Sequence, residues 1–213
     1  MTILHRSRHM SRRHVLVMAA ALAMSGTARA DTSYPSRSIR LLVPFAPGGT
    51  GDIVARLLGT RLGEELGQSI IVDNRGGAGS IIGTDAGAKA APDGYTLTIS
   101  NGAAITTGPL MGQRIPYRPM EDFVHLLLIG TFSNMLVVRS DHPAKTLREF
   151  VELSRKNAAG INWGSAGVGS AGFLAGELLA QLAKAKMVHV PYKGTGPAMN
   201  DLLGGSLDAM LTS

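Results

Sequence analysis

The stretch "PFAPGGTGD", Pro44–Asp52, decides the fold prediction. It follows a short apolar run at residues 39–43 that is typical of a buried strand. It leads into apolar residues at helical spacing between residues 52 and 66, and Gly67 is expected to end that helix. A glycine-rich turn between a strand and a helix commonly binds an anion through backbone amides. The first question is therefore which kind of anion this turn could hold.

The order of strand, loop and helix repeats along the chain. Strands are expected at residues 69–74, 95–100, 161–164, 187–192 and 207–211, and helices at 80–90, 147–157, 171–183 and 197–203. Residues 125–130 and 134–139 are expected to pair with each other as strands. The alternation predicts an α/β fold with a parallel sheet covered by helices. Ligands bind at the carboxyl ends of the strands in such sheets.

Four glycine-bearing loops fall at these predicted strand ends. They are "APGGTGD" at 46–52, "NGA" at 101–103, "GSAGVGS" at 164–170 and "KGTG" at 193–196. The first and third contain no arginine, so recognition there would rest on backbone amides and on the hydroxyls of Thr50 and Ser170. Neutral donors suit a small carboxylate that must be released again. Asp52 either caps its helix, which is the favoured interpretation, or accepts a hydrogen bond from a ligand hydroxyl or amine.

Nucleotide binding is poorly supported by the motifs. "GGAGSIIG", Gly76–Gly83, resembles the dinucleotide fingerprint G-x-G-x-x-G, but its last glycine comes one position late. The acidic residue expected at the end of the next strand is absent, since Ser100 and Asn101 stand there. No phosphate-binding loop of the form G-x-x-x-x-G-K-[ST] occurs. We therefore expect no nucleotide and no other cofactor.

Catalysis and metal binding are also disfavoured. The nucleophile motif G-x-S-x-G fails at Ser165, which has Trp163 two positions before it, and at Ser170, which has Val168 there. His125, His142 and His189 lie in or beside apolar runs and turns, and no two of them share metal-ligand spacing. We therefore expect a protein that is not an enzyme and has no metal site.

The first thirty residues have the composition of an export signal. They hold five arginines and no acid, then an apolar run from Val15 to Met24, then "ARA" at 28–30. Cleavage is expected after Ala30, by the general secretory route or, given "SRRHVL" from Ser11, by the twin-arginine route. The true start could be Met1 or Met10. The expected location is the periplasm.

Residues 31–213 differ in charge from the whole chain. They carry 16 Lys and Arg against 15 Asp and Glu, so the net charge falls from +6 to +1 and no basic block suggests nucleic acid. No second long apolar segment occurs, so the mature chain is expected not to span a membrane. The chain has no cysteine, which excludes disulfides and thiol chemistry.

Several longer stretches together resemble one protein family. They are residues 34–100, "PAKTLREF" at 143–150, "GSAGVGSAGFLAGELL" at 164–179 and "VHVPYKGTGPAMNDLLGGSLDAML" at 188–211. The chain resembles the Bug/tripartite tricarboxylate transporter receptor family of periplasmic solute-binding proteins. The resemblance implies a two-lobed, type II-like periplasmic-binding fold, with a first lobe at residues 31–131 and a second at 132–213.

The resemblance also implies a ligand and its binding residues. The ligand would be a small mono-, di- or tricarboxylate, handed to membrane transporter subunits or sensed by a kinase. The clamp residues carried over from the family are Pro47, Gly48, Gly49, Thr50 and Asp52 in the first lobe and Ser165, Gly167, Gly169 and Ser170 in the second, with Asn101, Gly102, Lys193, Gly194 and Thr195 lining the cleft. Lys193 is either a charge partner for the distal end of a dicarboxylate or a solvated turn lysine.

The chain departs from the family pattern at three places. Phe173 stands where the family usually has histidine, which alters either the cleft or only the packing. "TGPLMGQRIPY" at 107–117 replaces a region where the family tends to have an asparagine–proline turn. Family members continue well beyond residue 213, so an incomplete first lobe with exposed apolar surface and low stability is expected. The alternative function is a truncated remnant that binds nothing.

Overall fold

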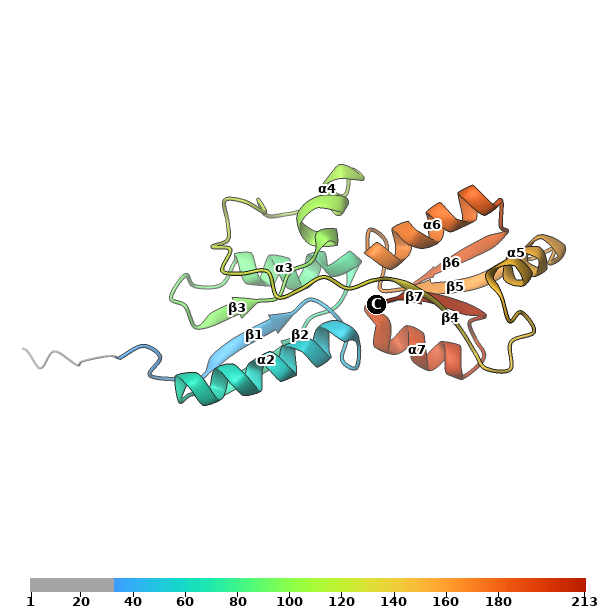
Figure 1. The fold of residues 1–213 in the computed structure, drawn as a ribbon. Helices are drawn as coiled ribbons and strands as arrows, with labels where there is room; N and C mark the ends of the chain where they lie inside the picture. Colours follow the sequence, from blue (N-terminus) through green and yellow to red (C-terminus); the bar gives the residue numbers. More distant parts are fainter. Residues whose placement is uncertain (1–32) are drawn as a thin grey trace, which may run out of the picture. The chain divides into compact units, whose positions relative to one another are not determined.

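The computed structural model describes residues 33–213 (Figure 1). The predicted signal peptide and its cleavage site lie outside the described residues. Pro35–Ser213 form one compact unit, which carries every helix and strand of the described residues. None of its helices is long and apolar enough to cross a membrane.

The first sheet has three parallel strands in the order β2-β1-β3. The strands are β1 at Ile39–Val43, β2 at Ile70–Asn74 and β3 at Thr96–Thr98. Helix α2, Thr50–Leu66, connects β1 to β2, and α3, Ile81–Ala88, connects β2 to β3. The parallel pairing and the helical connections confirm the predicted α/β fold for this part of the chain.

The core of the first sheet centres on its middle strand. Four of the five β1 residues are buried, whereas no residue of β2 or β3 is. The buried cluster is Leu41, Val43, Ala55 and Ile99. The middle strand is therefore covered on both faces, as expected for a near-continuous apolar run in a parallel sheet.

The second sheet has four strands in the order β4-β7-β5-β6. The strands are β4 at Met135–Val138, β5 at Ile161–Ser165, β6 at Met187–Pro191 and β7 at Ala209–Thr212. The helices are α5 at Leu147–Lys156, α6 at Ala171–Ala183 and α7 at Thr195–Leu203. β5 pairs in parallel with β6 and β7, and β4 pairs antiparallel with β7.

The core of the second sheet contains large aromatic side chains. Trp163 and Phe150 are buried, and Phe173 packs against them. Gly176 of α6 lies against the Trp163 indole so closely that a Cβ there would overlap the ring. Glycine at this position lets the helix approach the sheet.

Short irregular helices follow β2 and β3 of the first sheet. A 3₁₀ turn at Ala78–Ser80 precedes α3, and a π-helical turn at Ala103–Thr107 runs into the short helix α4 at Gly108–Leu110. The predicted "NGA" loop therefore leads directly into a helical turn. Single π turns of this kind are frequent at functional sites.

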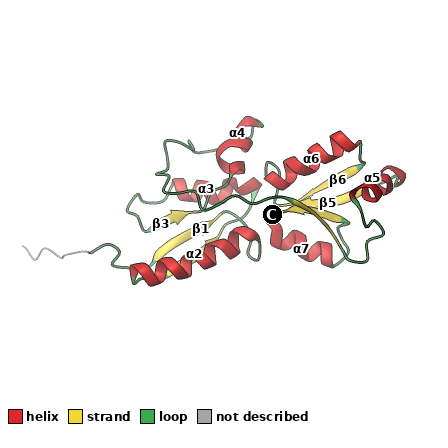
Figure 2. Cartoon of the chain, viewed as in Figure 1, coloured by secondary structure: helices red, strands yellow, loops and turns green. Residues whose placement is uncertain are grey.

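The predicted strand pair formed by residues 125–130 and 134–139 is wrong. Residues 124–134 form no strand, and β4 pairs instead with β7, which lies about seventy residues further along the chain. Figure 2 shows this segment as loop. It pairs with no strand of the described residues, and Leu126, Leu127 and Leu128 are each at least 70% exposed. An apolar run alone does not determine which strand will pair with it.

The predicted end of α2 is confirmed, whereas the predicted starts of α2 and α7 are each two residues late. Gly67 has a left-handed conformation (φ 62°) and ends α2 as predicted. Helix α2 begins at Thr50, two residues before the predicted start. Its N-cap is Gly49, and Asp52 lies inside its first turn. Helix α7 likewise begins at Thr195 rather than at residue 197.

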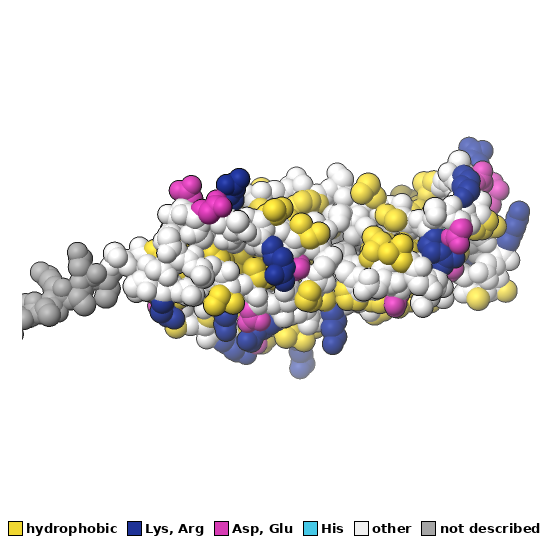
Figure 3. Space-filling view, turned by 90° about the horizontal axis from the view of Figure 1, so that it is seen from below, with side chains coloured by type: hydrophobic (Ala, Val, Ile, Leu, Met, Phe, Trp, Pro, Cys, Tyr) yellow, Lys and Arg dark blue, Asp and Glu magenta, His cyan; other side chains and the backbone are white. Residues whose placement is uncertain are grey.

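Exposed apolar side chains are not confined to the 124–134 segment. Ile53 and Leu57 of α2 are more than half exposed, as are Leu178 and Leu182 of α6. On the face drawn in Figure 3, apolar side chains lie among lysine and arginine side chains. Exposed apolar side chains therefore occur on α2 and α6 as well as in the 124–134 segment.

Candidate functional site

The loop after β1 packs against the loop after β6. The Ala46 amide donates to the Lys193 carbonyl (2.8 Å), and the Thr50 amide donates to the Thr195 hydroxyl (3.3 Å). A Cβ at Gly49 would overlap Thr195 Oγ1, and one at Gly194 would lie 2.9 Å from the Ala46 nitrogen. The glycines predicted in both loops are therefore required by the close approach of the two backbones.

The loop after β5 contacts a different pair of segments. The Thr107 hydroxyl donates to the Gly169 carbonyl (2.7 Å), and Gly79 lies directly against the Val168 carbonyl. Gly167 and Gly169 have φ values of +119° and +85°, which glycine adopts without strain. The structure thus pairs loop 46–52 with loop 193–196 and loop 164–170 with residues 79 and 107. Direct ligand contact by these loops stays a prediction.

Asp52 lies in the first turn of α2 with a counter-ion. It is 4% exposed, its Oδ2 accepts from the Gly48 amide (3.0 Å) and from Arg56 Nε (3.1 Å), and its Oδ1 lies 3.0 Å from an Arg56 nitrogen. Burial raises the pKa of Asp52, but these hydrogen bonds outweigh it and hold the pKa below its ordinary value. The charge is neutralised locally, so Asp52 does not repel an anion as a free carboxylate would.

Both predicted serines beside the second sheet, Ser165 and Ser170, have structural hydrogen bonds. Ser170 is the N-cap of α6, and its hydroxyl accepts from the Phe173 amide (3.2 Å). Ser165 is fully buried, and its hydroxyl lies 2.8 Å from His189 Nε2 and accepts from the Gly167 amide (3.1 Å). Ser165 therefore helps to shape the loop from inside.

Phe173 and His189 belong to the aromatic core of the second sheet. The Phe173 ring centroid lies 4.8 Å from His189 and 6.4 Å from Trp163. Burial lowers the pKa of His189. Of the two interpretations left open for Phe173, the structure shows packing.

Asn101 organises the turn after β3. Its side-chain oxygen accepts from the Ser80 hydroxyl (2.8 Å) and from the Ala104 amide (3.1 Å). The Gly102 carbonyl accepts from the Thr106 hydroxyl (2.9 Å). These bonds tie the start of the π-helical turn to the 78–80 turn.

A pocket of about 420 Å³ lies where these segments meet. Its lining contains glycine-loop, apolar and cationic residues: Ala78, Gly79, Ile81, Gln113, Arg114, Gly167, Val168, Pro191, Tyr192 and Lys193. Of the predicted site residues, only Gly167 and Lys193 line it. The lining includes two cations and no acid, so its electrostatics favour an anion.

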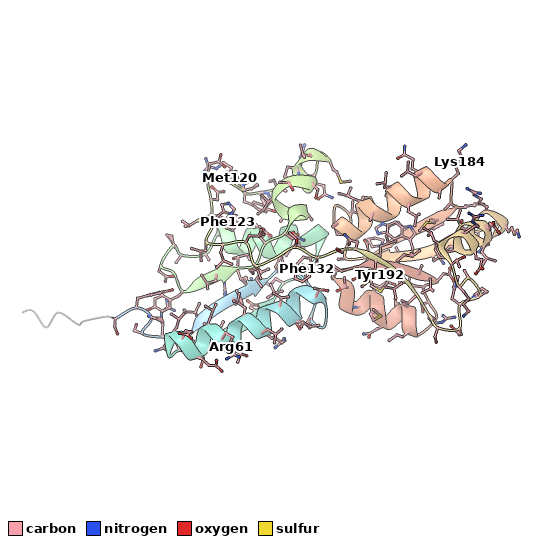
Figure 4. All side chains as sticks on the ribbon, in the orientation of Figure 1. Arg61, Met120, Phe123, Phe132, Lys184 and Tyr192 are labelled. Atoms are coloured by element: carbon pink, nitrogen blue, oxygen red, sulfur yellow. The ribbon has the colours of Figure 1, made fainter. Side chains whose placement is uncertain are left out.

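The Tyr192 side chain lines the pocket but has no free hydrogen-bond donor for a ligand. Its hydroxyl donates to Asp201 Oδ2 (2.5 Å), and burial together with this carboxylate raises its pKa to about 12. The phenol is therefore neutral and already engaged. Tyr192, labelled in Figure 4, directly follows β6 and precedes α7.

Sequence reasoning missed five of the lining residues on the first-sheet side. They are Ala78, Gly79, Ile81, Gln113 and Arg114. Both stretches carry a signal in the sequence: Ala78, Gly79 and Ile81 lie in "GGAGSIIG", which resembles a nucleotide fingerprint, and Gln113 and Arg114 lie in the atypical stretch 107–117. No group of three His, Asp or Glu side chains suitable for a metal occurs within residues 33–213.

Solved structures resemble the chain closely in fold. A protein described as a periplasmic transporter is 40% identical, with a TM-score of 0.80 over 84% of this chain and 60% of that one. A Rhodopseudomonas palustris protein with adipate is 33% identical with a TM-score of 0.80, again over 84% and 60%. MatC of the same organism, with bound malate, is 35% identical with a TM-score of 0.77 over 84% and 61%.

Sequence comparison finds relatives of the same kind as these solved structures. A UPF0065 protein from the tcbD-tcbE intergenic region of Pseudomonas sp. (strain P51) is 38% identical over 207 residues, which is 96% of this chain and 61% of that protein. The chain spans about 60% of the length of the relatives it matches. The model of the tripartite tricarboxylate transporter family receptor matches residues 54–213. The chain therefore belongs to this family of periplasmic binding proteins, whose members are receptors and not enzymes.

Proposed function

We propose that this chain captures a small organic carboxylate in the periplasm and presents it to a membrane transporter or a sensor. Its family and the adipate and malate held by two related proteins support a carboxylate as the ligand. Capture and delivery by this chain are proposals, because it spans about 60% of its relatives' length.

The observation that carries the proposal is the pocket between the glycine loops. Arg114 and Lys193 line it, no acidic residue does, and Gly79 and Gly167 bring backbone to its wall. Among the hydrogen bonds of residues 33–213, none uses the amides of Val168 or Gly169. Of these two residues Val168 lines the pocket, so its amide is a free donor in a lining that also holds two cations, which suits carboxylate oxygens.

The proposed mechanism is a shift between open and closed arrangements of the two sheets. The ligand would contact loop 164–170 on one side and the 78–81 turn on the other, so it would stabilise the state in which both are close. Helix α6 begins at this loop, and its N-terminal end adds a favourable potential for the carboxylate. Binding energy then depends on the difference in contacts between the two states.

The test is calorimetric titration of the chain with mono-, di- and tricarboxylates, checked by thermal shift. We expect heat and an increased melting temperature with at least one of them. Lys193→Gln should weaken that binding about tenfold if Lys193 is a charge partner, whereas the control Lys156→Gln on α5 should not. If no carboxylate gives heat or a thermal shift, the proposal is wrong and the chain behaves as the non-binding alternative.

Periplasmic export is the second part of the proposal. The family supports a periplasmic location, and the composition of residues 1–30 supports cleavage after Ala30. Mass spectrometry of the chain recovered from a periplasmic extract should find a mature form that begins at Asp31. Recovery only in the cytoplasm with an intact N-terminus would contradict it.

A further inference from the structure

We propose that Arg114 is a specificity residue of this pocket and that it favours ligands with a second carboxylate. This inference rests on the proposed function and names its ligand more narrowly. Arg114 lies in the stretch 107–117, which the family resemblance did not explain, and it lines the pocket together with Lys193.

The backbone on either side of the pocket positions Arg114. The Thr107 hydroxyl donates to the Gly169 carbonyl (2.7 Å), and the Gln113 amide nitrogen donates to the Gly108 carbonyl (3.0 Å). The Gln113 side chain lies 3.0–4.0 Å from the points where Cβ atoms of Gly79, Gly108 and Gly169 would stand. The residue before Arg114 is therefore packed among the 78–80 turn, the start of α4 and loop 164–170, which holds Arg114 at the pocket.

The charge of Arg114 is available to a ligand. No ion pair within 4.0 Å joins Arg114 or Lys193 to an acid anywhere in residues 33–213. By contrast, Arg56 and Arg118 each pair with an aspartate. Two unpaired cations from different segments of one pocket match two carboxylates better than one.

The rest of the wall suits the part of the ligand between the charges. Ile81, Val168 and Pro191 are apolar, and the Tyr192 hydroxyl is already bonded to Asp201. A volume of about 420 Å³ accommodates a short aliphatic chain with a carboxylate at each end. A monocarboxylate of equal length would leave one cation without a partner.

The experiment compares adipate with hexanoate, which has the same number of carbons and one carboxylate fewer. Both are titrated calorimetrically into the chain, into Arg114→Gln and into the matched control Arg148→Gln, an exposed arginine on α5. We expect the unmodified chain to bind adipate at least tenfold more tightly than hexanoate. Arg114→Gln should reduce adipate affinity about tenfold and leave hexanoate unchanged, and Arg148→Gln should change neither.

The outcomes separate the two proposals. If both ligands bind equally, or if Arg114→Gln weakens both by the same factor, the role of Arg114 in selectivity is wrong while carboxylate capture stands. If no carboxylate of the wider panel binds, both proposals are wrong. Circular dichroism of each variant establishes that an altered affinity does not come from unfolding.

Discussion

The two sheets of the molecule are stabilised in different ways. The four-stranded sheet buries every residue of β7 and packs Trp163, Phe150 and Phe173 into one aromatic core. The three-stranded sheet buries side chains mainly from β1, and its flanking strands stay half exposed. Loop 164–170 therefore rests on a filled core, whereas loop 46–52 depends more on polar contacts such as those of Asp52.

The largest effect is expected from crowding the aromatic core. In Gly176→Val the new side chain would overlap the Trp163 ring, which is fully buried and cannot move aside. We expect a loss of about 3 kcal/mol in the free energy of unfolding. Urea denaturation followed by fluorescence measures it, because Trp163 is the only tryptophan of the chain.

A matched control places the same side chain one position further along α6. Glu177 is exposed, so Glu177→Val should cost less than about 1 kcal/mol. If the two variants unfold at the same urea concentration, the second sheet does not depend on tight packing against Trp163.

A smaller effect is expected when the polar support of loop 46–52 is removed. Asp52→Asn places an amide against the Arg56 guanidinium and weakens a charged hydrogen-bond pair, which should cost about 2 kcal/mol at pH 7. The pKa of Asp52 is below its ordinary value in the folded chain. Its stabilisation is therefore present above the unfolded-state pKa of about 3.9 and is lost as pH falls through the lower folded value.

Urea denaturation at pH 7 and at pH 3 tests the direction of this pH dependence. The stability difference between the unmodified chain and Asp52→Asn should shrink at pH 3. Glu64→Gln on the same helix removes an exposed ion pair with Arg61 and should change stability by less than about 0.5 kcal/mol. If the two chains differ in free energy of unfolding by the same amount at both pH values, the ionised form of Asp52 contributes nothing to stability.

Tyr192→Phe should have a still smaller effect on the free energy of unfolding. It removes one hydrogen bond to Asp201 and should cost about 1 kcal/mol. The raised pKa, about 12, means that the contribution is present below the ordinary tyrosine pKa of about 10 and is lost as pH rises through the folded value. In an ultraviolet titration of the four tyrosines, the ionisation step near pH 12 should be absent from Tyr192→Phe and present in Tyr117→Phe.

The smallest effect is expected on the 124–134 segment. Leu128 is 80% exposed, so Leu128→Gln should change the free energy of unfolding by less than about 0.5 kcal/mol. Leu41 of β1 is 2% exposed, and the comparison variant Leu41→Ala should cost about 2 kcal/mol. A loss above 1 kcal/mol for Leu128→Gln in urea denaturation would mean that this leucine is covered in solution.

Local signals could be predicted from the sequence, and long-range pairing could not. The run at 39–43, the spacing along α2 and the end at Gly67 depend on neighbours within a few residues. β4 pairs with β7, which is distant in the sequence. Residues 125–130 have the apolar composition of a strand but pair with no strand of the described residues. Pattern alone contains no information on which distant segment supplies the hydrogen bonds.

The same limit applies to the candidate site. The glycine loops were predictable because strand ends and turn residues are local features. The contact between Thr50 and Thr195 joins residues 145 positions apart, and the Gln113 side chain lies close to both Gly79 and Gly169. Arg114 becomes a candidate only when the fold places it in the same pocket lining as Lys193.

The crowded glycines also constrain how this protein can change. A Cβ at Gly49, Gly79 or Gly196 would meet a neighbouring atom, so drift and laboratory mutagenesis should both leave these positions as glycine. Arg114 is exposed and accepts other side chains without such a collision. A library randomised at residue 114 alone would therefore explore new ligand preferences while the loops that form the pocket keep their inherited shape.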